Sequence, residues 1–283
     1  MLFFQSVKTY PLIIAHRGAR SIAPENTLAA AQKAIETGAD AWELDVQLTS
    51  DGVPVIIHDK TLSGTSDIKH INAFSGKNPW PVHKFSLAEL RQLDFGSWFV
   101  RKDPFGQIAG GAVSEKDMQS FKKIPALTLG EALIFSKKAG FRVNVEIKDL
   151  SGLPGDSIVV GKVLEIVEAS EMNEHVVISS FQHIYLRQSK ALNPDISIAA
   201  LTDSRYSDPI VLLRRLGAEA YHPRSDIINP KTVSMLENEG FHVNIWILND
   251  PASVEKFVKA GISGFFTDFP QRFTSFSKNT ISP

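Results

Sequence analysis

Short runs of β-branched and aliphatic residues recur along the chain, and amphipathic stretches with helical spacing lie between most of them. Eight runs predict strands: Leu12–Ala15, Ala41–Val46, Val143–Lys148, Val176–Ser180, Ile196–Leu201, Ala218–His222, Val243–Leu248 and Ser263–Thr267. Except across the interval from Ala41 to Val143, each start follows the previous one at a distance that suits one strand and one helix. Eight alternating units predict a parallel sheet closed into a (β/α)8 barrel, the TIM-barrel architecture of the α/β class.

The starts of several helices carry capping signals. Thr128 followed by Glu131 has the pattern of a capping box, and Gly140 is a typical helix stop. Three further pairs place a capping side chain before a proline at the first helical position: Asp208-Pro209, Asn229-Pro230 and Asp250-Pro251. Because each pair follows a predicted strand, these positions are typical of the loops that join strands to helices.

The interval after the second strand departs from this repeat. Asp51-Gly52 between two strand-like runs predicts a β-hairpin, with Val53–Ile57 as the antiparallel return and Asp45 opposite His58. Beyond it, residues from about 60 to 123 are rich in Gly, Ser, Asn, Pro and charge, with one expected helix at Ser86–Leu93. We expect a single domain over residues 1–283, with this segment inserted as a functional loop or lid.

Composition and charge narrow the classes of function. The chain has 30 Lys and Arg against 31 Asp and Glu, so its net charge of −1 gives no general attraction to nucleic acid or anionic membranes. The absence of cysteine excludes disulfides, thiolate nucleophiles and cysteine-held metals. No apolar stretch is long enough to span a membrane, and the first residues lack the features of a secretory signal. We therefore expect a soluble, cytoplasmic chain with no nucleic-acid partner and no stable membrane insertion.

Three carboxylates are candidate metal ligands. Glu43 and Asp45 are two residues apart on one strand and share a face, and Glu146 has the equivalent place on the next barrel strand. Barrel active sites lie at the carboxyl ends of the strands, so these side chains should converge. Oxygen ligands suit one hard divalent cation, Mg²⁺ or Ca²⁺. Glu43 and Asp45 alone would also fit an ion-pair site.

Two histidines and two cations should join them. His16 and Arg17 follow the first strand, Lys148 ends the third, and the hairpin returns His58 to the same level. Two imidazoles can divide acid and base roles, and cations beside a metal suit a phosphate ligand. Together, the three carboxylates, two histidines and two cations indicate metal-assisted phosphoryl transfer. Alternatively, Lys148 could offset the charge of Glu146, and Arg17 could anchor a loop.

Motifs in this order resemble the glycerophosphodiester phosphodiesterase family, one of the phosphatidylinositol-phospholipase C-like TIM barrels. The most specific are His16-Arg17-Gly18, Pro24-Glu25-Asn26-Thr27, Glu43-Leu44-Asp45-Val46, Thr49-Ser50-Asp51-Gly52 and His58-Asp59. Weaker ones follow as far as the last strand: Glu146-Ile147-Lys148, Ser179-Ser180-Phe181, His222-Pro223, Trp246 and Thr267-Asp268-Phe269-Pro270. The resemblance thus covers nearly the whole chain.

The resemblance implies hydrolysis of glycerophosphodiesters to sn-glycerol 3-phosphate and an alcohol. By matched position it implies an acid/base pair, a metal-binding set, two phosphate contacts and two residues against the glycerol. The acid/base pair is His16 and His58, and the metal-binding set is Glu43, Asp45 and Glu146. The phosphate contacts are Arg17 and Lys148, and the residues against the glycerol are Trp246 and Phe181. Whether water attacks directly or a cyclic phosphate forms first stays open, as do the metal, the alcohol and the oligomeric state.

Two departures from the family pattern bear on substrate preference. The segment after His58-Asp59 reads TLSGTS, without the basic residue common in the family, and Ile247 stands where threonine is usual. Two other functions stay open. A lysophospholipase D-type phosphodiesterase would need an apolar groove, which Phe74, Trp80, Trp98 and Phe99 could supply. A barrel that binds phosphodiesters without catalysis is the other.

Overall fold

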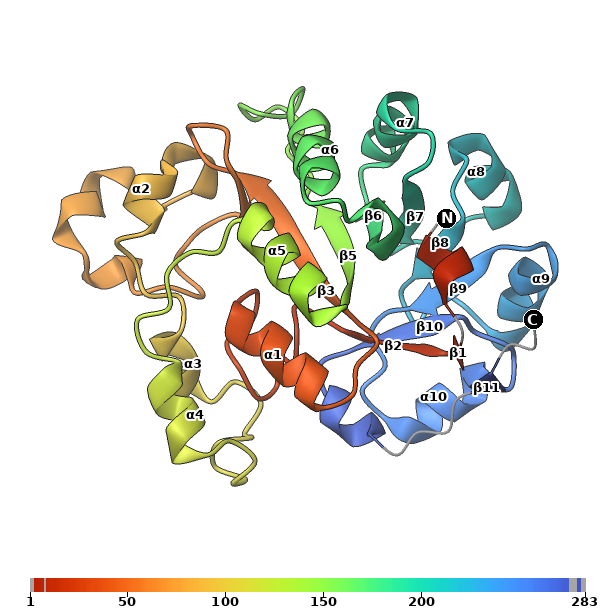
Figure 1. Cartoon of the computed structure of the whole chain (residues 1–283), viewed down its shortest axis with the longest axis horizontal. Helices are drawn as coiled ribbons and strands as arrows, with labels where there is room; N and C mark the ends of the chain where they lie inside the picture. The colour runs from red at the N-terminus through yellow and green to blue at the C-terminus, as the bar shows by residue number, and fades with distance from the viewer. Residues whose placement is uncertain (1–2, 8, 275–278, 281–283) are drawn as a thin grey trace.

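The computed structural model describes residues 3–7, 9–274 and 279–280, and its centre is a closed parallel barrel (Figure 1). The barrel strands are β2 (Leu12–Ala15), β3 (Ala41–Leu48), β5 (Arg142–Ile147), β6 (Val176–Ser180), β7 (Ser197–Thr202), β8 (Ala220–Pro223), β9 (His242–Ile245) and β10 (Gly264–Thr267). The barrel closes because β2 pairs in parallel with both β3 and β10. The predicted TIM barrel is confirmed, with strand bounds shifted by only a few residues.

Helices cover the outside of the barrel between successive strands. They are α1 (Leu28–Glu36), α5 (Leu129–Ala139), α6 (Val159–Ala169), α7 (His183–Leu192), α8 (Pro209–Leu216), α9 (Pro230–Asn238) and α10 (Pro251–Val258), with the 3-10 helices η5 (Asn173–His175) and η6 (Pro270–Phe273). The predicted capping box at Thr128 forms, and Asp208, Asn229 and Asp250 each cap a helix whose first turn holds proline. Capping side chains thus fix where these helices begin.

Apolar side chains of the strands face the helices, which leaves the other face of each strand to the barrel interior. On β3, Trp42 and Leu44 are buried in the main core, and the Trp42 indole donates to Ser136 of α5 at 2.9 Å. At the amino-terminal end, Phe3 and Phe4 of η1 (Phe3–Ser6) pack with interior residues such as Leu12. A short pair, β1 (Thr9–Tyr10) with β11 (Asn279–Thr280), lies beside η1. This packing fills the end of the barrel opposite the strand carboxyl ends.

The hairpin forms, but its register differs from the prediction by one residue. Strand β4 (Pro54–Ile56) pairs antiparallel with β3, with Gln47 opposite Val55. The turn holds three residues because Thr49 and Val53 close it, with the Val53 amide donating to the Thr49 hydroxyl at 2.8 Å. Asp45 therefore lies opposite Ile57, whose amide donates to the Asp45 carbonyl, and not opposite His58 as predicted.

The segment from 60 to 123 lies at one side of the barrel (Figure 1), and part of it packs in a small apolar cluster that also includes Val55 and Ile57 of the hairpin. The segment contains η2 (Ile68–His70), η3 (Asn72–Lys77), η4 (Val82–Lys84), α2 (Leu87–Leu90), α3 (Ser97–Lys102) and α4 (Glu115–Ser120). The expected helix shrinks to α2, which Ser86 caps, and α3 and α4 were not predicted. Phe74, Trp98 and Phe99 are buried in cores, so they do not form the apolar groove considered above.

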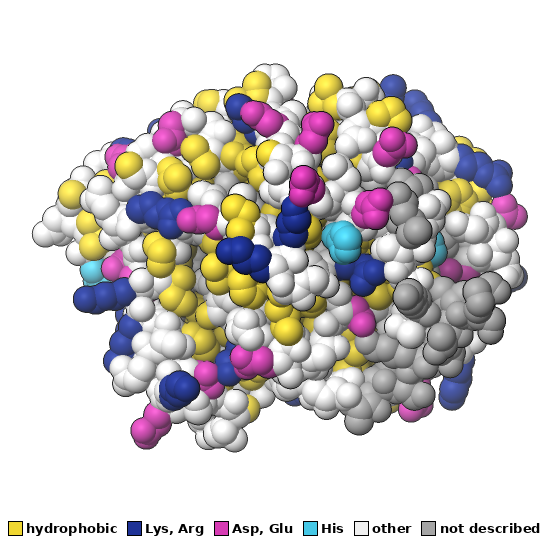
Figure 2. Space-filling model, in the orientation of Figure 1, with side chains coloured by type: hydrophobic (Ala, Val, Ile, Leu, Met, Phe, Trp, Pro, Cys, Tyr) yellow, Lys and Arg dark blue, Asp and Glu magenta, His cyan; other side chains and the backbone are white. Residues whose placement is uncertain are grey.

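The described residues also show how charge is distributed on one face and whether any helix could cross a membrane. Lys and Arg side chains are interspersed with Asp and Glu on the face shown in Figure 2, in keeping with a net charge of −1. Among the helices of the described ranges, none combines the length and the apolar character needed to cross a membrane.

Candidate active site

Three carboxylates meet at the carboxyl ends of β3 and β5. Asp45 lies opposite Glu146 in the parallel register, and Glu43 precedes Asp45 on the same face. All three side chains are buried, and each offers an oxygen within 4.8 Å of the others. One oxygen of Glu43 accepts no hydrogen bond within the described part of the chain, and one oxygen of Asp45 has only the Lys148 ammonium beside it, at 3.2 Å. An unpartnered oxygen among three clustered carboxylates fits a divalent cation of the Mg²⁺ or Ca²⁺ type.

The electrostatics of the cluster agree with that fit. Burial, together with the neighbouring carboxylates, raises the pKa of Glu43 well above its usual range, and burial likewise raises that of Glu146. Burial also opposes ionisation of Asp45, but Lys148 and Arg17 outweigh it and lower its pKa. A bound cation would favour the ionised form of all three, since an opposite charge nearby stabilises a carboxylate.

Arg17 and Lys148 are tied to these acids. The Arg17 amide donates to Glu43 at 2.7 Å, and its guanidinium lies 3.4 Å from Asp45. The Lys148 ammonium is 2.6 Å from Glu146 and 3.2 Å from Asp45. Both cations therefore offset the carboxylates and, because they also line the pocket described below, stand beside any ligand placed there.

Residues 24–27 organise this corner of the site. The Asn26 amide donates to Asp45 at 2.8 Å, and Glu25 pairs with Arg17 at 2.9 Å. Thr27 caps α1 by accepting from the Ala30 amide. The sequence indicates the motif that contains Glu25 and Asn26 but does not predict the contacts of either residue. An asparagine just before a capping threonine was the available signal.

His16 follows β2 directly, and its Nδ1 lies 2.7 Å from an oxygen of Asp268 at the end of β10. The Asn249 amide holds the other oxygen of Asp268 at 2.9 Å. Burial lowers the pKa of His16 to about 4, so the ring is neutral near pH 7. Asp268 also received no role. Closure of the predicted barrel could have indicated a role for Asp268, because it brings the end of the last strand beside the end of the first.

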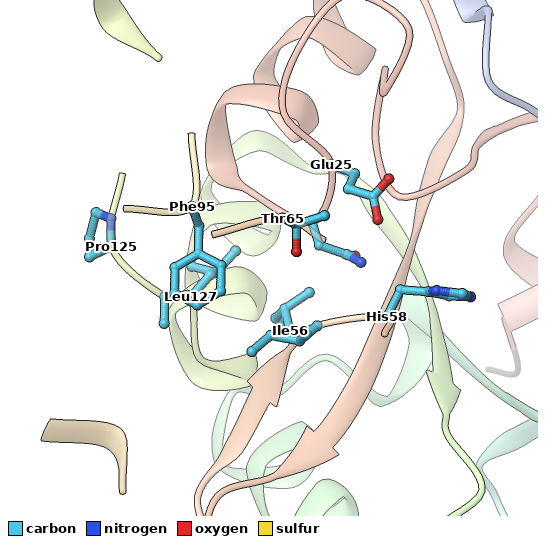
Figure 3. A pocket seen from close by; sticks show the side chains of 10 residues that line it. Glu25, Ile56, His58, Thr65, Phe95, Pro125 and Leu127 are labelled. Carbon is cyan, nitrogen blue, oxygen red and sulfur yellow. The ribbon is translucent and has the colours of Figure 1, made fainter. Parts of the chain in front are cut away.

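His58 enters from the opposite side. Its Nδ1 lies 2.8 Å from Asp59, and the Gln47 amide donates to the carbonyls of Ile57 and Asp59, both at 2.8 Å. Figure 3 shows the imidazole pointing away from apolar Ile56 beside it. The chain leaves the sheet after Ile56, so His58 reaches the site despite the shifted register.

These side chains surround one cavity of about 230 Å³ at the mouth of the barrel. It is lined by eight of the nine predicted site residues: His16, Arg17, Glu43, His58, Glu146, Lys148, Phe181 and Trp246. The ninth, Asp45, is joined to the lining through Arg17 and Lys148. Asn144, two residues before Glu146 on β5, also lines the cavity and was not predicted.

Two aromatic rings form one wall. Phe181 and Trp246 meet edge to face with ring centroids 5.6 Å apart, and the Trp246 indole donates to the His222 carbonyl at 2.9 Å. Phe181 is 40% exposed, so it is not a core residue. Apolar rings opposite a charged cluster can hold the carbon skeleton of a polar ligand while its anionic group faces the cations.

Comparison with known proteins gives concordant results. A family model described as the glycerophosphoryl diester phosphodiesterase family matches residues 16–272. A glycerophosphodiester phosphodiesterase of Caldanaerobacter subterraneus subsp. tengcongensis is 34% identical, over 92% of this chain and 95% of its own length. One from Bacillus altitudinis is 31% identical, over 92% and 95%.

Solved structures agree. A phosphodiesterase of Oleispira antarctica, in complex with the product sn-glycerol-3-phosphate, superposes with a TM-score of 0.77 at 29% identity, covering 94% of this chain and 96% of that one. A putative glycerophosphoryl diester phosphodiesterase from Silicibacter pomeroyi gives 0.79 at 25% identity, with 95% of both chains covered. From the match across residues 16–272 and these relatives, this chain belongs to the glycerophosphoryl diester phosphodiesterase family.

Proposed function

We propose that this protein is a metal-dependent phosphodiesterase that hydrolyses glycerophosphodiesters to sn-glycerol 3-phosphate and an alcohol. The observation that carries the proposal is the buried triad Glu43, Asp45 and Glu146, in which one Glu43 oxygen accepts no hydrogen bond in the described part of the chain, in a site flanked by two histidines and two cations. The product in the Oleispira antarctica relative supports the choice of substrate.

The triad would hold one divalent cation. When bound, Mg²⁺ or Ca²⁺ supplies positive charge that polarises the phosphate and stabilises charge developing on its oxygens. We favour these two ions because the triad offers carboxylate oxygens only and the chain has no cysteine. Arg17 and Lys148 would bind the remaining phosphate charge, since both line the same cavity.

His16 and His58 would serve as the general acid/base pair. One imidazole accepts the proton of the attacking hydroxyl, and the other donates a proton to the departing alcohol oxygen as its bond to phosphorus breaks. This proton balance describes direct attack by water. Attack by the adjacent glycerol hydroxyl would first give a cyclic phosphate, which water would then open with the two imidazole roles exchanged. Asp268 would orient His16 through the contact at Nδ1, which leaves Nε2 for the reaction.

Phe181 and Trp246 would pack against the glycerol moiety. Their edge-to-face contact forms an apolar wall of the cavity that also holds the charged cluster. Glycerol presents CH and CH₂ groups on one side when its hydroxyls face polar partners, so a wall of this kind suits it.

A product assay tests the proposal. Purified protein with Mg²⁺ or Ca²⁺ is given glycerophosphocholine or lysophosphatidylcholine, and released sn-glycerol 3-phosphate, lysophosphatidic acid and choline are measured. We expect glycerol 3-phosphate and choline from the first substrate. Faster turnover of the lysolipid would favour a lysophospholipase D-type activity, and binding without turnover would favour a non-catalytic barrel.

A further inference from the structure

A second cavity, of about 420 Å³, adjoins the catalytic one. The two share His58, Glu146, Lys148 and Phe181 as lining residues. His58 and the proposed phosphate contact Lys148 thus border both cavities. By contrast, His16, Arg17 and Trp246 border only the first. A diester whose phosphate lies at this boundary extends one ester arm into each cavity. We call the second space the outer cavity.

The walls of the outer cavity come from two segments. On one side the inserted segment supplies Lys60 and His83, held together because the Val82 amide donates to the Lys60 carbonyl at 3.1 Å. On the other, the loop after β5 supplies Asp149 and Ser151, where the Ser151 amide donates to Asp149 at 2.9 Å. The insertion, which we expect from the sequence to be a functional loop or lid, therefore forms part of a substrate-sized space.

The charges in these walls balance. Apart from the residues shared with the catalytic cavity, the lining has one cation, Lys60, and one anion, Asp149. Hydrogen bonds with Ser151 lower the pKa of Asp149, which keeps it ionised. Burial, aided by Lys84, lowers the pKa of His83, so the ring is neutral near pH 7 and can both donate and accept.

This lining disfavours three kinds of alcohol. A quaternary ammonium group prefers several aromatic faces, but Phe181 is the one phenyl ring among the lining residues. An acyl chain needs a continuous apolar wall, and charged or hydroxyl side chains interrupt it here. A phosphorylated alcohol needs uncompensated cations, and Asp149 offsets Lys60. A set of mixed donors and acceptors without net charge instead matches a row of hydroxyl groups.

We propose that the outer cavity receives the leaving alcohol of the diester and selects an uncharged polyhydroxy alcohol through Lys60, His83 and Asp149. This inference rests on the proposed phosphodiesterase function and adds the class of alcohol to it. Glycerol and cyclohexane polyols belong to this class.

The test compares kcat/KM for glycerophosphoglycerol and glycerophosphoinositol with kcat/KM for glycerophosphocholine. We expect both polyol diesters to be preferred by the native protein. Because a hydrogen bond to a charged group contributes about 1.5–3 kcal/mol, Lys60→Ala or Asp149→Asn should lower this preference by roughly tenfold or more. Lys69→Ala, an exposed lysine of the same inserted segment, is the matched control and should leave the preference unchanged.

Equal or better turnover of glycerophosphocholine by the native protein would overturn this inference while leaving the phosphodiesterase function standing. So would a preference that neither Lys60→Ala nor Asp149→Asn alters. Absence of turnover with every diester would overturn the proposed function itself, and this inference with it.

Discussion

The charged side chains of the candidate site hold one another in place. Glu43 accepts from the backbone of Arg17, Asp45 accepts from Asn26, and Glu146 pairs with Lys148. Hydrogen bonds and ion pairs of this kind make the positions of buried polar groups specific, because leaving one unpaired is costly. Single substitutions here should therefore report on function with little ambiguity about which contact was lost.

The two histidines give the clearest prediction for catalysis. His16→Ala or His58→Ala should each lower kcat by about 10²–10⁴, the usual contribution of general acid/base catalysis. Release of sn-glycerol 3-phosphate measures the effect, and His70→Ala, which removes an exposed histidine, is the control. A kcat near that of the native protein for either site variant would exclude that histidine from proton transfer.

His222 gives a prediction for stability. Burial lowers the pKa of His222 to about 3, so the native state keeps it neutral while the unfolded chain protonates it near its ordinary value. Its contribution is therefore complete above that ordinary value and is lost as the pH falls toward the folded value. From about pH 7 to about pH 4.5, native protein should lose about 2.5 kcal/mol more of its free energy of unfolding than His222→Asn does.

Denaturant unfolding at the two pH values measures this difference. Glu237, whose pKa burial raises to about 7, acts in the opposite direction but equally in both proteins, so the comparison cancels it. An identical pH dependence in the two proteins would show that His222 titrates normally.

At this scale the sequence predicts the site residues whose place depends on strand alternation. Glu43, Asp45 and Glu146 share a face because successive strand residues alternate. Asp268 and Asn26 were not assigned roles because they act through side-chain partners far away in the chain, and only closure of the barrel selects those partners.

The strands and helices are specified mainly by local signals. Asn229 accepts from the Thr232 amide at 3.0 Å at the start of α9, and Pro230 occupies the first turn. Similar pairs precede α8 and α10. Such caps need only neighbouring residues, so the sequence predicts them well.

The cap of α9 can be tested directly. Asn229→Ala should lower the free energy of unfolding by about 1 kcal/mol because one helix amide loses its partner. Lys231→Ala, two residues further on an exposed position, should change it little. Denaturant unfolding compares the two, and equal effects would mean that the side chain of Asn229 does not stabilise the helix.

Elements that depend on distant partners were harder to predict. The three-residue turn shifts the β3–β4 register because Thr49 closes it with a side-chain hydrogen bond. Helix α4 lies against the barrel through an ion pair between Asp117 and Lys33 of α1, and its neighbour Phe121 packs on Phe99. Neither contact is visible in local periodicity.

For the whole molecule, we propose that residues 1–283 form one domain in which the inserted segment is an integral part. Its apolar cluster includes Val55 and Ile57, which belong to the hairpin, and the Phe85 carbonyl accepts from Ser50 at 2.8 Å. The cluster therefore spans both parts, and the outer cavity lies where they meet.

Truncation of the Phe85 side chain tests whether the barrel and the inserted segment unfold together as one domain. The side chain is fully buried in the shared cluster, so Phe85→Ala should lower the free energy of unfolding by about 3–5 kcal/mol within a single transition. Leu192→Ala, at a residue 64% exposed, should have a much smaller effect. Two separate transitions, with that of the barrel unchanged, would show that the insertion folds on its own.

Metal dependence is the central claim for the molecule as a whole, because Glu43, Glu146, both cations and both histidines line one cavity, and Asp45 lies against its two cations. The most direct measurement is release of sn-glycerol 3-phosphate from a glycerophosphodiester before EDTA treatment, after it, and after Mg²⁺ or Ca²⁺ is restored. We predict that excess EDTA abolishes turnover and that at least one of the two ions recovers it. Unchanged turnover in excess EDTA would contradict the account.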